Sequence, residues 1–348
     1  MRLALNCIIL FLSHCCFSQH ARAQGASVRW ASALDSLPRQ ANTWAHPQLR
    51  SFAATASMLD AALTSLNSLR TVISKDNYRN RVTALNNPAS SELGFSLEGE
   101  VQAALQPILA KTRTVNTTRF TDIAGALLRV APQGSALPVV PALTALVANL
   151  AVQEKRVSRE DVDTFLQRTG RYFAPYEKLN KANEAFEQQV VRLNSRLVEL
   201  QFDIREYTLD IVILLHPREQ RSVLRQKTIE DLLLQFLDGP VLDSLDGLRD
   251  LPAYPSDAVK GAKDICNNVQ KLFREYQKIY GDNYNEIRSI VQSARGLARS
   301  GSSAASESAL RELEALYTES AQADALNLRL SALTGRLQAL VLSTTVST

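Results

Sequence analysis

An apolar repeat between residues 176 and 214 constrains the possible folds of this chain more than any other feature. Its positions alternate spacings of three and four residues without a slip, and all but Asn183 are apolar or tyrosine. Such a repeat keeps one face of an α-helix against a partner helix along its whole length. We predict a rod of roughly 58 Å, ending at His216 because a residue before proline is pushed out of the α conformation. The repeat consists of Tyr176, Leu179, Asn183, Phe186, Val190, Leu193, Leu197, Leu200, Ile204, Tyr207, Ile211 and Leu214.

Three other stretches show the same helical periodicity. The first is Leu49, Phe52, Ala56, Leu59, Leu63, Leu66 and Ile73. The next is Val259, Ala262, Cys266, Val269, Phe273, Tyr276, Tyr280, Tyr284, Ile287, Val291 and Ala294, with one departure at residues 281–283 where we expect a kink or local unwinding. The last is Leu310, Leu313, Leu316, Leu326, Leu330, Leu333, Leu337 and Leu340. These patterns predict an all-α fold, an elongated antiparallel bundle of about four long coiled-coil-like helices, with a shorter helix at about 218–237.

An apolar helical insertion separates the first and second long helices. Residues 130–153 carry no charged side chain, and Pro138 and Pro141 leave about a dozen residues free to be helical, fewer than the roughly 20 that span a bilayer. We therefore favour a buried helix over a concealed membrane-inserting element or a permanent transmembrane helix. The candidate buried or membrane-facing side chains in segment 136–152 are Leu137, Val139, Val140, Leu143, Leu146, Val147 and Leu150. An apolar insertion on a long helical bundle resembles, in organisation only, the α-helical pore-forming toxins.

Residues 1–23 have the three parts of a secretory signal peptide. Arg2 precedes an apolar run centred on residues 8–12, and Ala21-Arg22-Ala23 provides a cleavage site before Gln24. This predicts export to the periplasm or the extracellular space. The expected organisation is then an N-terminal segment with the first long helix at 24–87, the inserted subdomain at 88–157 and the remaining bundle helices at 158–348.

The sequence contains none of the common catalytic motifs, among them G-x-S-x-G, G-x-G-x-x-G and H-E-x-x-H. After cleavage the chain keeps only Cys266, His46 and His216, too few for a zinc site of the usual kind. We expect Cys266 to be a buried free thiol, because it lies on an apolar stripe. With 39 basic against 35 acidic residues, nothing indicates a nucleic-acid partner. We predict no enzyme activity, catalytic residue, cofactor, metal or small-molecule substrate.

A charged stripe follows one flank of the Tyr176–Leu214 repeat and is the best candidate for a partner-facing surface. Its spacing places it on one helix face, formed by Arg192, Arg196, Glu199, Asp203, Glu206 and Asp210. A solvated face is the favoured interpretation, ahead of ion pairing between helices or subunits and of metal binding. The nearby basic residues Arg218, Arg221, Arg225 and Lys227 are interpreted as a solvated helix start.

These observations favour an exported, non-enzymatic helical bundle that acts as a structural or protein-interaction module. Its partner would be another protein, or a second copy, bound through the long helices. The alternative is a membrane-active, pore-forming-like protein that uses segment 136–152; membrane contact is possible but not favoured.

Overall fold

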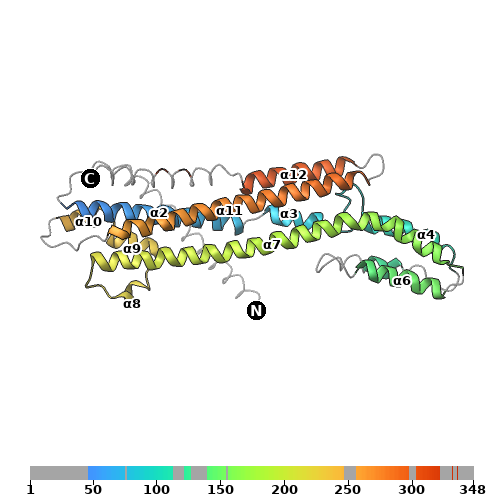
Figure 1. Cartoon of the computed structure of the whole chain (residues 1–348), viewed down its shortest axis with the longest axis horizontal. Coiled ribbons are helices and arrows are strands. Elements are labelled where there is room, and N and C mark those ends of the chain that lie inside the picture. The colour runs from blue at the N-terminus through green and yellow to red at the C-terminus, as the bar shows by residue number, and fades with distance from the viewer. Residues whose placement is uncertain are drawn as a thin grey trace, which may run out of the picture. The chain divides into compact units, whose positions relative to one another are not determined.

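The computed structural model describes residues 46–74, 77–112, 121–126, 139–153, 156–246, 256–297 and 303–321, with isolated positions 331 and 335. These residues are helical or form short connections, without a β-strand, so the fold is all-α as predicted (Figure 1). The proposed signal peptide at 1–23 lies outside the described residues. So do Leu137 and the repeat from Leu326 to Leu340.

Three helices are long. Helix α2 spans Pro47–Ser74, α7 spans Arg159–Leu215 with 57 residues, and α11 spans Ser256–Arg295 with 40 residues. Helix α7 begins well before the repeat because Ser158 and Asp161 form a capping box. The Asp161 amide donates to the Ser158 hydroxyl at 3.2 Å, and the Ser158 amide donates to the Asp161 carboxylate at 2.9 Å.

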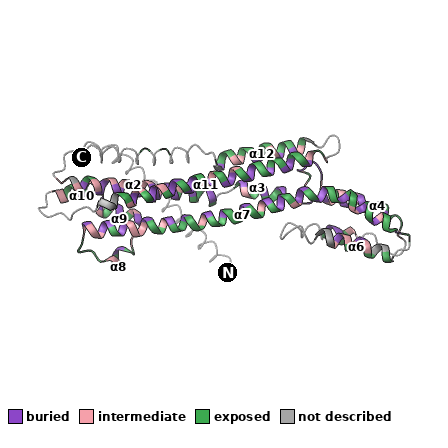
Figure 2. Ribbon diagram, in the orientation of Figure 1, coloured by how far each residue is buried: buried purple, intermediate pink, exposed green. Residues whose placement is uncertain are grey.

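The predicted repeat on α7 is largely buried. Only Asn183, Tyr207 and Leu214 among its twelve positions are half-exposed, and the rest have lost nearly all contact with solvent. Figure 2 shows the resulting alternation of buried and exposed residues along α7. The stripes on α2 and α11 are buried in the same way wherever their side chains are described. Burial of these apolar side chains is the main source of stability for helices of this length.

The chain forms two compact units, each assembled from segments distant in the sequence. One combines the described residues up to Arg70 with those of Ser195–Phe273, and the other combines those of Thr71–Asn194 with those of Arg274–Asp324. Helices α2, α7 and α11 each contribute to both units. The two units are described separately below.

The first unit contains three short helices after the end of α7. They are α8 at Arg221–Leu224, α9 at Ile229–Phe236 and α10 at Gly239–Asp246. The single helix predicted at 218–237 is therefore wrong. Thr228 interrupts it, because its hydroxyl accepts a 3.0 Å hydrogen bond from the Asp231 amide and caps a new helix there.

The same unit holds two close contacts of α11. The Cys266 thiol is buried and donates to the Met58 carbonyl at 3.5 Å, as expected for an unreactive core cysteine. Gly261 lies directly against Tyr207: a β-carbon added at this glycine would be 2.7 Å from the tyrosine hydroxyl oxygen. The absence of a side chain at position 261 is therefore what lets the ring of Tyr207 approach α11.

The second unit contains α3 at Asn77–Leu85 and α12 at Ser303–Ala321, which pack against each other. Its core is rich in tyrosine. The ring centroids of Tyr78 and Tyr280 are 5.5 Å apart, and those of Phe186 and Tyr280 are 5.0 Å apart. The Tyr78 hydroxyl donates to the Asn283 side-chain oxygen at 2.7 Å, so this buried polar group is satisfied.

The kink or unwinding expected at residues 281–283 is not present, because α11 continues through these residues as one helix. A β-carbon at Gly281 would be 3.3 Å from the hydroxyl oxygen of Tyr317, whose ring stacks on Tyr284 with centroids 4.6 Å apart. The departure from the repeat therefore accommodates a tyrosine of α12 and leaves the backbone of α11 helical.

The predicted insertion also belongs to this unit. It contains α4 at Leu97–Leu109, capped by Ser96, a helical turn at 121–126, and α6 at Val139–Gln153. Pro141 falls in the first turn of α6, where a missing amide hydrogen costs little.

Candidate functional site

The outer face of α7, opposite its buried repeat, carries a line of exposed apolar side chains. Val191, Val198 and Phe202 expose 59%, 61% and 60% of their surface. At about 100° per residue, Val198 and Phe202 lie about 20° to either side of Val191 around the helix axis. Scattered single apolar residues are normal on protein surfaces, whereas aligned ones with a polar rim are typical of interaction sites. We call these three residues the outer apolar line.

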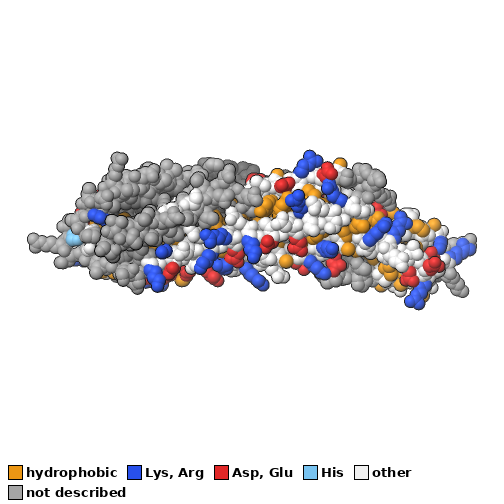
Figure 3. Space-filling view, turned by 45° about the horizontal axis from the view of Figure 1, so that its top comes forward, with side chains coloured by type: hydrophobic (Ala, Val, Ile, Leu, Met, Phe, Trp, Pro, Cys, Tyr) orange, Lys and Arg blue, Asp and Glu red, His pale blue; other side chains and the backbone are white. Residues whose placement is uncertain are grey.

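The predicted charged stripe runs beside the outer apolar line. Its first four members, Arg192, Arg196, Glu199 and Asp203, are exposed. Two positive charges precede two negative charges along the helix, so this part of the stripe has no net charge. Charged side chains of both signs are interspersed over the described surface in Figure 3, with apolar patches between them. The outer apolar line therefore has the charged rim that a protein interface has.

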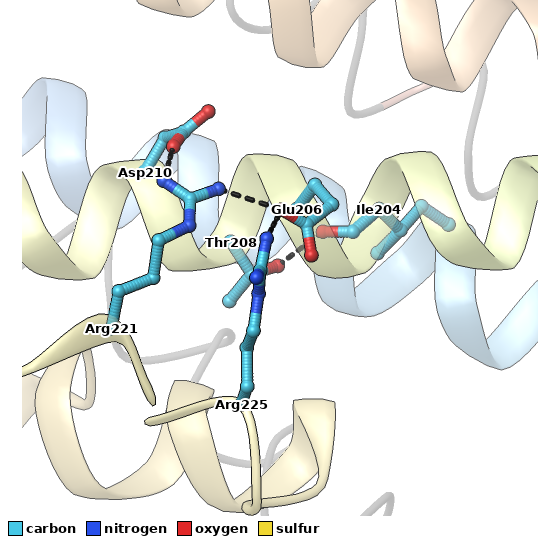
Figure 4. A network of polar contacts seen from close by, with 6 residues as sticks. All are labelled: Ile204, Glu206, Thr208, Asp210, Arg221 and Arg225. Atoms are coloured by element: carbon cyan, nitrogen blue, oxygen red, sulfur yellow. Dashed lines mark hydrogen bonds and ion pairs between the residues drawn. The ribbon is translucent and has the colours of Figure 1, made fainter. Parts of the chain in front are cut away.

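The other two members of the stripe are paired within the chain. After α7 ends, the chain reverses and brings two arginines of the α8 region back to it (Figure 4). Arg221 contacts Asp210 and Glu206, each at 2.6 Å, and Arg225 contacts Glu206 at 3.0 Å. Arg221 is thus at a helix start, as predicted, but these two partly exposed arginines also form ion pairs with α7. The stripe divides into an exposed half and a half that attaches α8 to α7.

These ion pairs change the electrostatics of the groups involved. Hydrogen bonds from Arg225 and Arg221 hold the pKa of Glu206 below its ordinary value, and the hydrogen bond to Glu206 raises the pKa of Arg221. Both effects favour the charged forms. Because these side chains are still partly exposed, the pairs define where α8 lies more than they stabilise the fold.

Backbone contacts reinforce this attachment. Arg205 donates to the carbonyl of Lys227 at 2.9 Å and also contacts that of Arg225. A ring nitrogen of His216 lies 3.0 Å from the Phe236 carbonyl, which gives this histidine a structural position at the end of α7. Leu209, on the same side of α7 as the outer apolar line, is fully buried in this region. The exposed line therefore ends before residue 209.

The apolar residues predicted in the insertion are only partly buried. Leu143 and Val147 are 1% and 0% exposed, whereas Val152, near the end of α6, is 83% exposed. Leu146 is half-buried, and Val139, Val140 and Leu150 are described only by their place in α6. The helix thus has a buried face and an exposed one, unlike the helix buried on all sides that we favoured. In the described part of the chain, no helix combines the length and apolar character needed to cross a membrane.

Within the ranges given above, no three histidine, cysteine or acidic side chains are gathered in a way that could ligate a metal ion. The backbone amide of His46 donates to the Asp246 carboxylate at 2.9 Å, which fastens the start of α2 to α10.

The outer apolar line was missed by the sequence analysis, although its spacings of seven and four residues are readable there. The buried repeat on the same helix dominates the pattern, so isolated apolar residues on the opposite side did not stand out. Comparisons with protein-family models, with curated proteins and with solved structures give no match to this chain.

Proposed function

We propose that this chain is an exported, non-enzymatic helical protein that acts as a structural or protein-interaction module. In this proposal its long coiled-coil-like helices form an elongated antiparallel bundle, and the outer face of α7 contacts a protein partner. The signal-peptide pattern at residues 1–23 supports export. The apolar repeats from Leu49, Tyr176, Val259 and Leu310 support a bundle of four helices.

The observation that carries the proposal is the outer apolar line. A single helix is apolar on two opposite sides between residues 191 and 202, and only one of those sides is buried. Keeping Phe202 and Val198 in water has a cost that burial against a partner would remove. The adjoining Arg192 and Glu199 would give such a contact its orientation, since charged rims contribute more to specificity than to affinity.

Site-specific photo-cross-linking tests this proposal. The photoreactive residue benzoylphenylalanine would replace Phe202 and, as a matched control, Gln167, which is exposed on the same helix away from the line. We expect irradiation of cells that make the protein to give protein adducts from position 202 and none from position 167. Equal yields at the two positions, or no adduct at position 202, would contradict an interaction surface on this face.

A dye-release assay separates this function from a membrane-active one. We expect the purified protein not to release dye from liposomes. Val147→Asp, which buries a carboxylate at a fully buried position, should act as a folding defect and lower the melting temperature. Release of dye by the wild type, lost in a Val147→Asp protein that melts normally, would refute the proposal and favour a pore-forming function.

A further inference from the structure

We infer that the partner of the outer apolar line is a second copy of this chain, bound with the two α7 helices antiparallel. This inference rests on the function proposed above and specifies its partner. It uses only the order of residues around α7, which is one continuous helix from Arg159 to Leu215.

The first argument is the symmetry of four exposed positions, namely the three residues of the outer apolar line and Ser195. Val191, Ser195, Val198 and Phe202 are all exposed and are separated by four, three and four residues. This spacing reads the same in both directions along the helix. When one copy is turned end to end about the midpoint between Ser195 and Val198, Val191 faces Phe202 of the other copy and Ser195 faces Val198. Spacings of three and four residues are those that form a helix–helix seam.

The second argument is the order of the charges. Arg192 directly follows Val191, and Glu199 directly follows Val198, so both lie on the same flank of the seam. Equivalent flanks face each other in an antiparallel pair. The point halfway between Arg192 and Glu199 lies only one residue, about 1.5 Å along the helix, from the point about which the four exposed positions are symmetric. Arg192 of each copy would therefore oppose Glu199 of the other, giving two symmetry-related ion pairs.

A parallel arrangement lacks this complementarity. The flank containing Arg192 and Glu199 would then face the opposite flank of the second copy, where residues 194 and 201 are uncharged amides, Asn and Gln. The remaining position on that flank, Glu187, already forms a bidentate ion pair with Arg79. The antiparallel arrangement is thus the one in which exposed charges meet their opposites.

The balance of charge also favours a second copy over other protein partners. A strongly acidic or basic partner would select a surface of one sign, but the exposed half of the stripe has two charges of each sign. A surface that is complementary to itself is what a twofold symmetric interface requires. Because only a few apolar side chains per copy take part, the buried area is expected below the roughly 1,200 Å² of a stable interface, giving a weak, reversible dimer.

Sedimentation equilibrium of the purified protein over a range of concentrations tests the inference. We expect a reversible monomer–dimer equilibrium that Phe202→Ser weakens at least about tenfold, because the change removes a large aromatic contact from each copy. Glu199→Arg should weaken dimerisation about fivefold, since it removes both exposed ion pairs and places like charges opposite each other. The double variant Arg192→Glu with Glu199→Arg should restore the wild-type constant, because exchanging the charges re-forms both pairs.

The outcomes distinguish this inference from the function on which it rests. A protein that stays monomeric at all concentrations, or a charge exchange that fails to restore dimerisation, would overturn the antiparallel pairing. If position 202 then cross-links to a different protein, the interaction function stands and the second copy is the wrong partner. If position 202 cross-links to nothing, both are wrong. Unchanged circular dichroism of the charge variants would show that their effects do not come from unfolding.

Discussion

Replacing Gly261 with alanine should destabilise this protein, although the same change at most helical glycines is stabilising. A β-carbon at position 261 would lie 2.7 Å from the Cε2 and hydroxyl oxygen atoms of Tyr207 and 2.8 Å from its Cζ atom. These separations are far inside van der Waals contact, and the three atoms belong to one rigid ring. The ring of Tyr207 must therefore move away from α11 and lose its contacts there.

The expected magnitude is a balance of two opposing terms. Removing the flexibility of a helical glycine favours alanine by about 0.5–1 kcal/mol. Overpacking of a well-filled contact costs about 1–3 kcal/mol. Because Tyr207 is half-buried and can shift partly, we expect the lower half of that range and a net loss of about 1 kcal/mol.

Gly170 provides the matched control. It lies inside α7, and a β-carbon there would meet no atom within 4 Å. Gly170→Ala should therefore raise stability by about 0.5–1 kcal/mol through the same gain in helix propensity. Urea unfolding followed by circular dichroism compares the two variants, and the midpoint should move in opposite directions.

A second substitution isolates the contact. In a Tyr207→Leu background the ring is absent, so Gly261→Ala should become neutral or stabilising. A coupling energy of about 1 kcal/mol between the two sites is expected for residues in contact. The reasoning would be refuted if Gly261→Ala stabilised the wild-type protein as much as Gly170→Ala does, or if its effect were the same with and without the tyrosine ring.

Three further predictions concern other parts of the chain. Asn183→Leu should raise the unfolding midpoint, because the buried Oδ1 atom of Asn183 accepts no hydrogen bond. Asn283→Leu should lower the midpoint, with a loss of about 1 kcal/mol or more in the free energy of unfolding, because it removes the hydrogen bond that Asn283 accepts from the Tyr78 hydroxyl; a common direction of change would contradict this. Arg225→Ala should raise the pKa of Glu206 toward its ordinary value, which carboxyl-carbon NMR titration would measure; an unchanged titration would show that the ion pair does not form. Because the pKa of Glu206 is lowered in the folded state, its charged form stabilises the attachment of α8 at higher pH. The attachment should weaken as the pH falls through the pKa of Glu206 in the folded protein. Mass spectrometry of the native protein should find Gln24 at its N-terminus, and a retained Met1 would disprove the cleavage site.

The sequence predicted the features of the fold that depend on local periodicity. The buried face of α7 follows from spacings of three and four residues. Such a spacing depends only on residues a few positions apart along one helix, which a single sequence displays directly. The start of α7 is set by Ser158 and Asp161, which lie well before the repeat and were not part of the predicted rod. The hydroxyl of Thr228 is also a local signal, yet the apolar pattern on both sides of it suggested one continuous helix.

Contacts between distant segments could not be predicted in the same way. The pairing of Arg221 and Arg225 with α7 depends on the direction in which the chain turns after Pro217, and charge alone does not determine that direction. The approach of Tyr207 to Gly261 joins residues that no periodic pattern relates. Charged residues in particular have the same local appearance whether they face water or an oppositely charged neighbour.

The claim that the outer face of α7 binds a second copy of the chain is tested most directly by a distance between two spin labels. Ala185 is exposed on α7 and distant from the centre of the proposed pair, and the buried Cys266 should stay unlabelled. With a label on Ala185→Cys, double electron–electron resonance at dimer-forming concentrations should give a distance of about 36 Å between the two labels. Each label lies 11.5 residues from the midpoint of the pair, at about 1.5 Å per residue, and the two helix axes are expected about 10 Å apart. The absence of any distance between labels, or a distance below about 20 Å as in a parallel pair, would contradict the account.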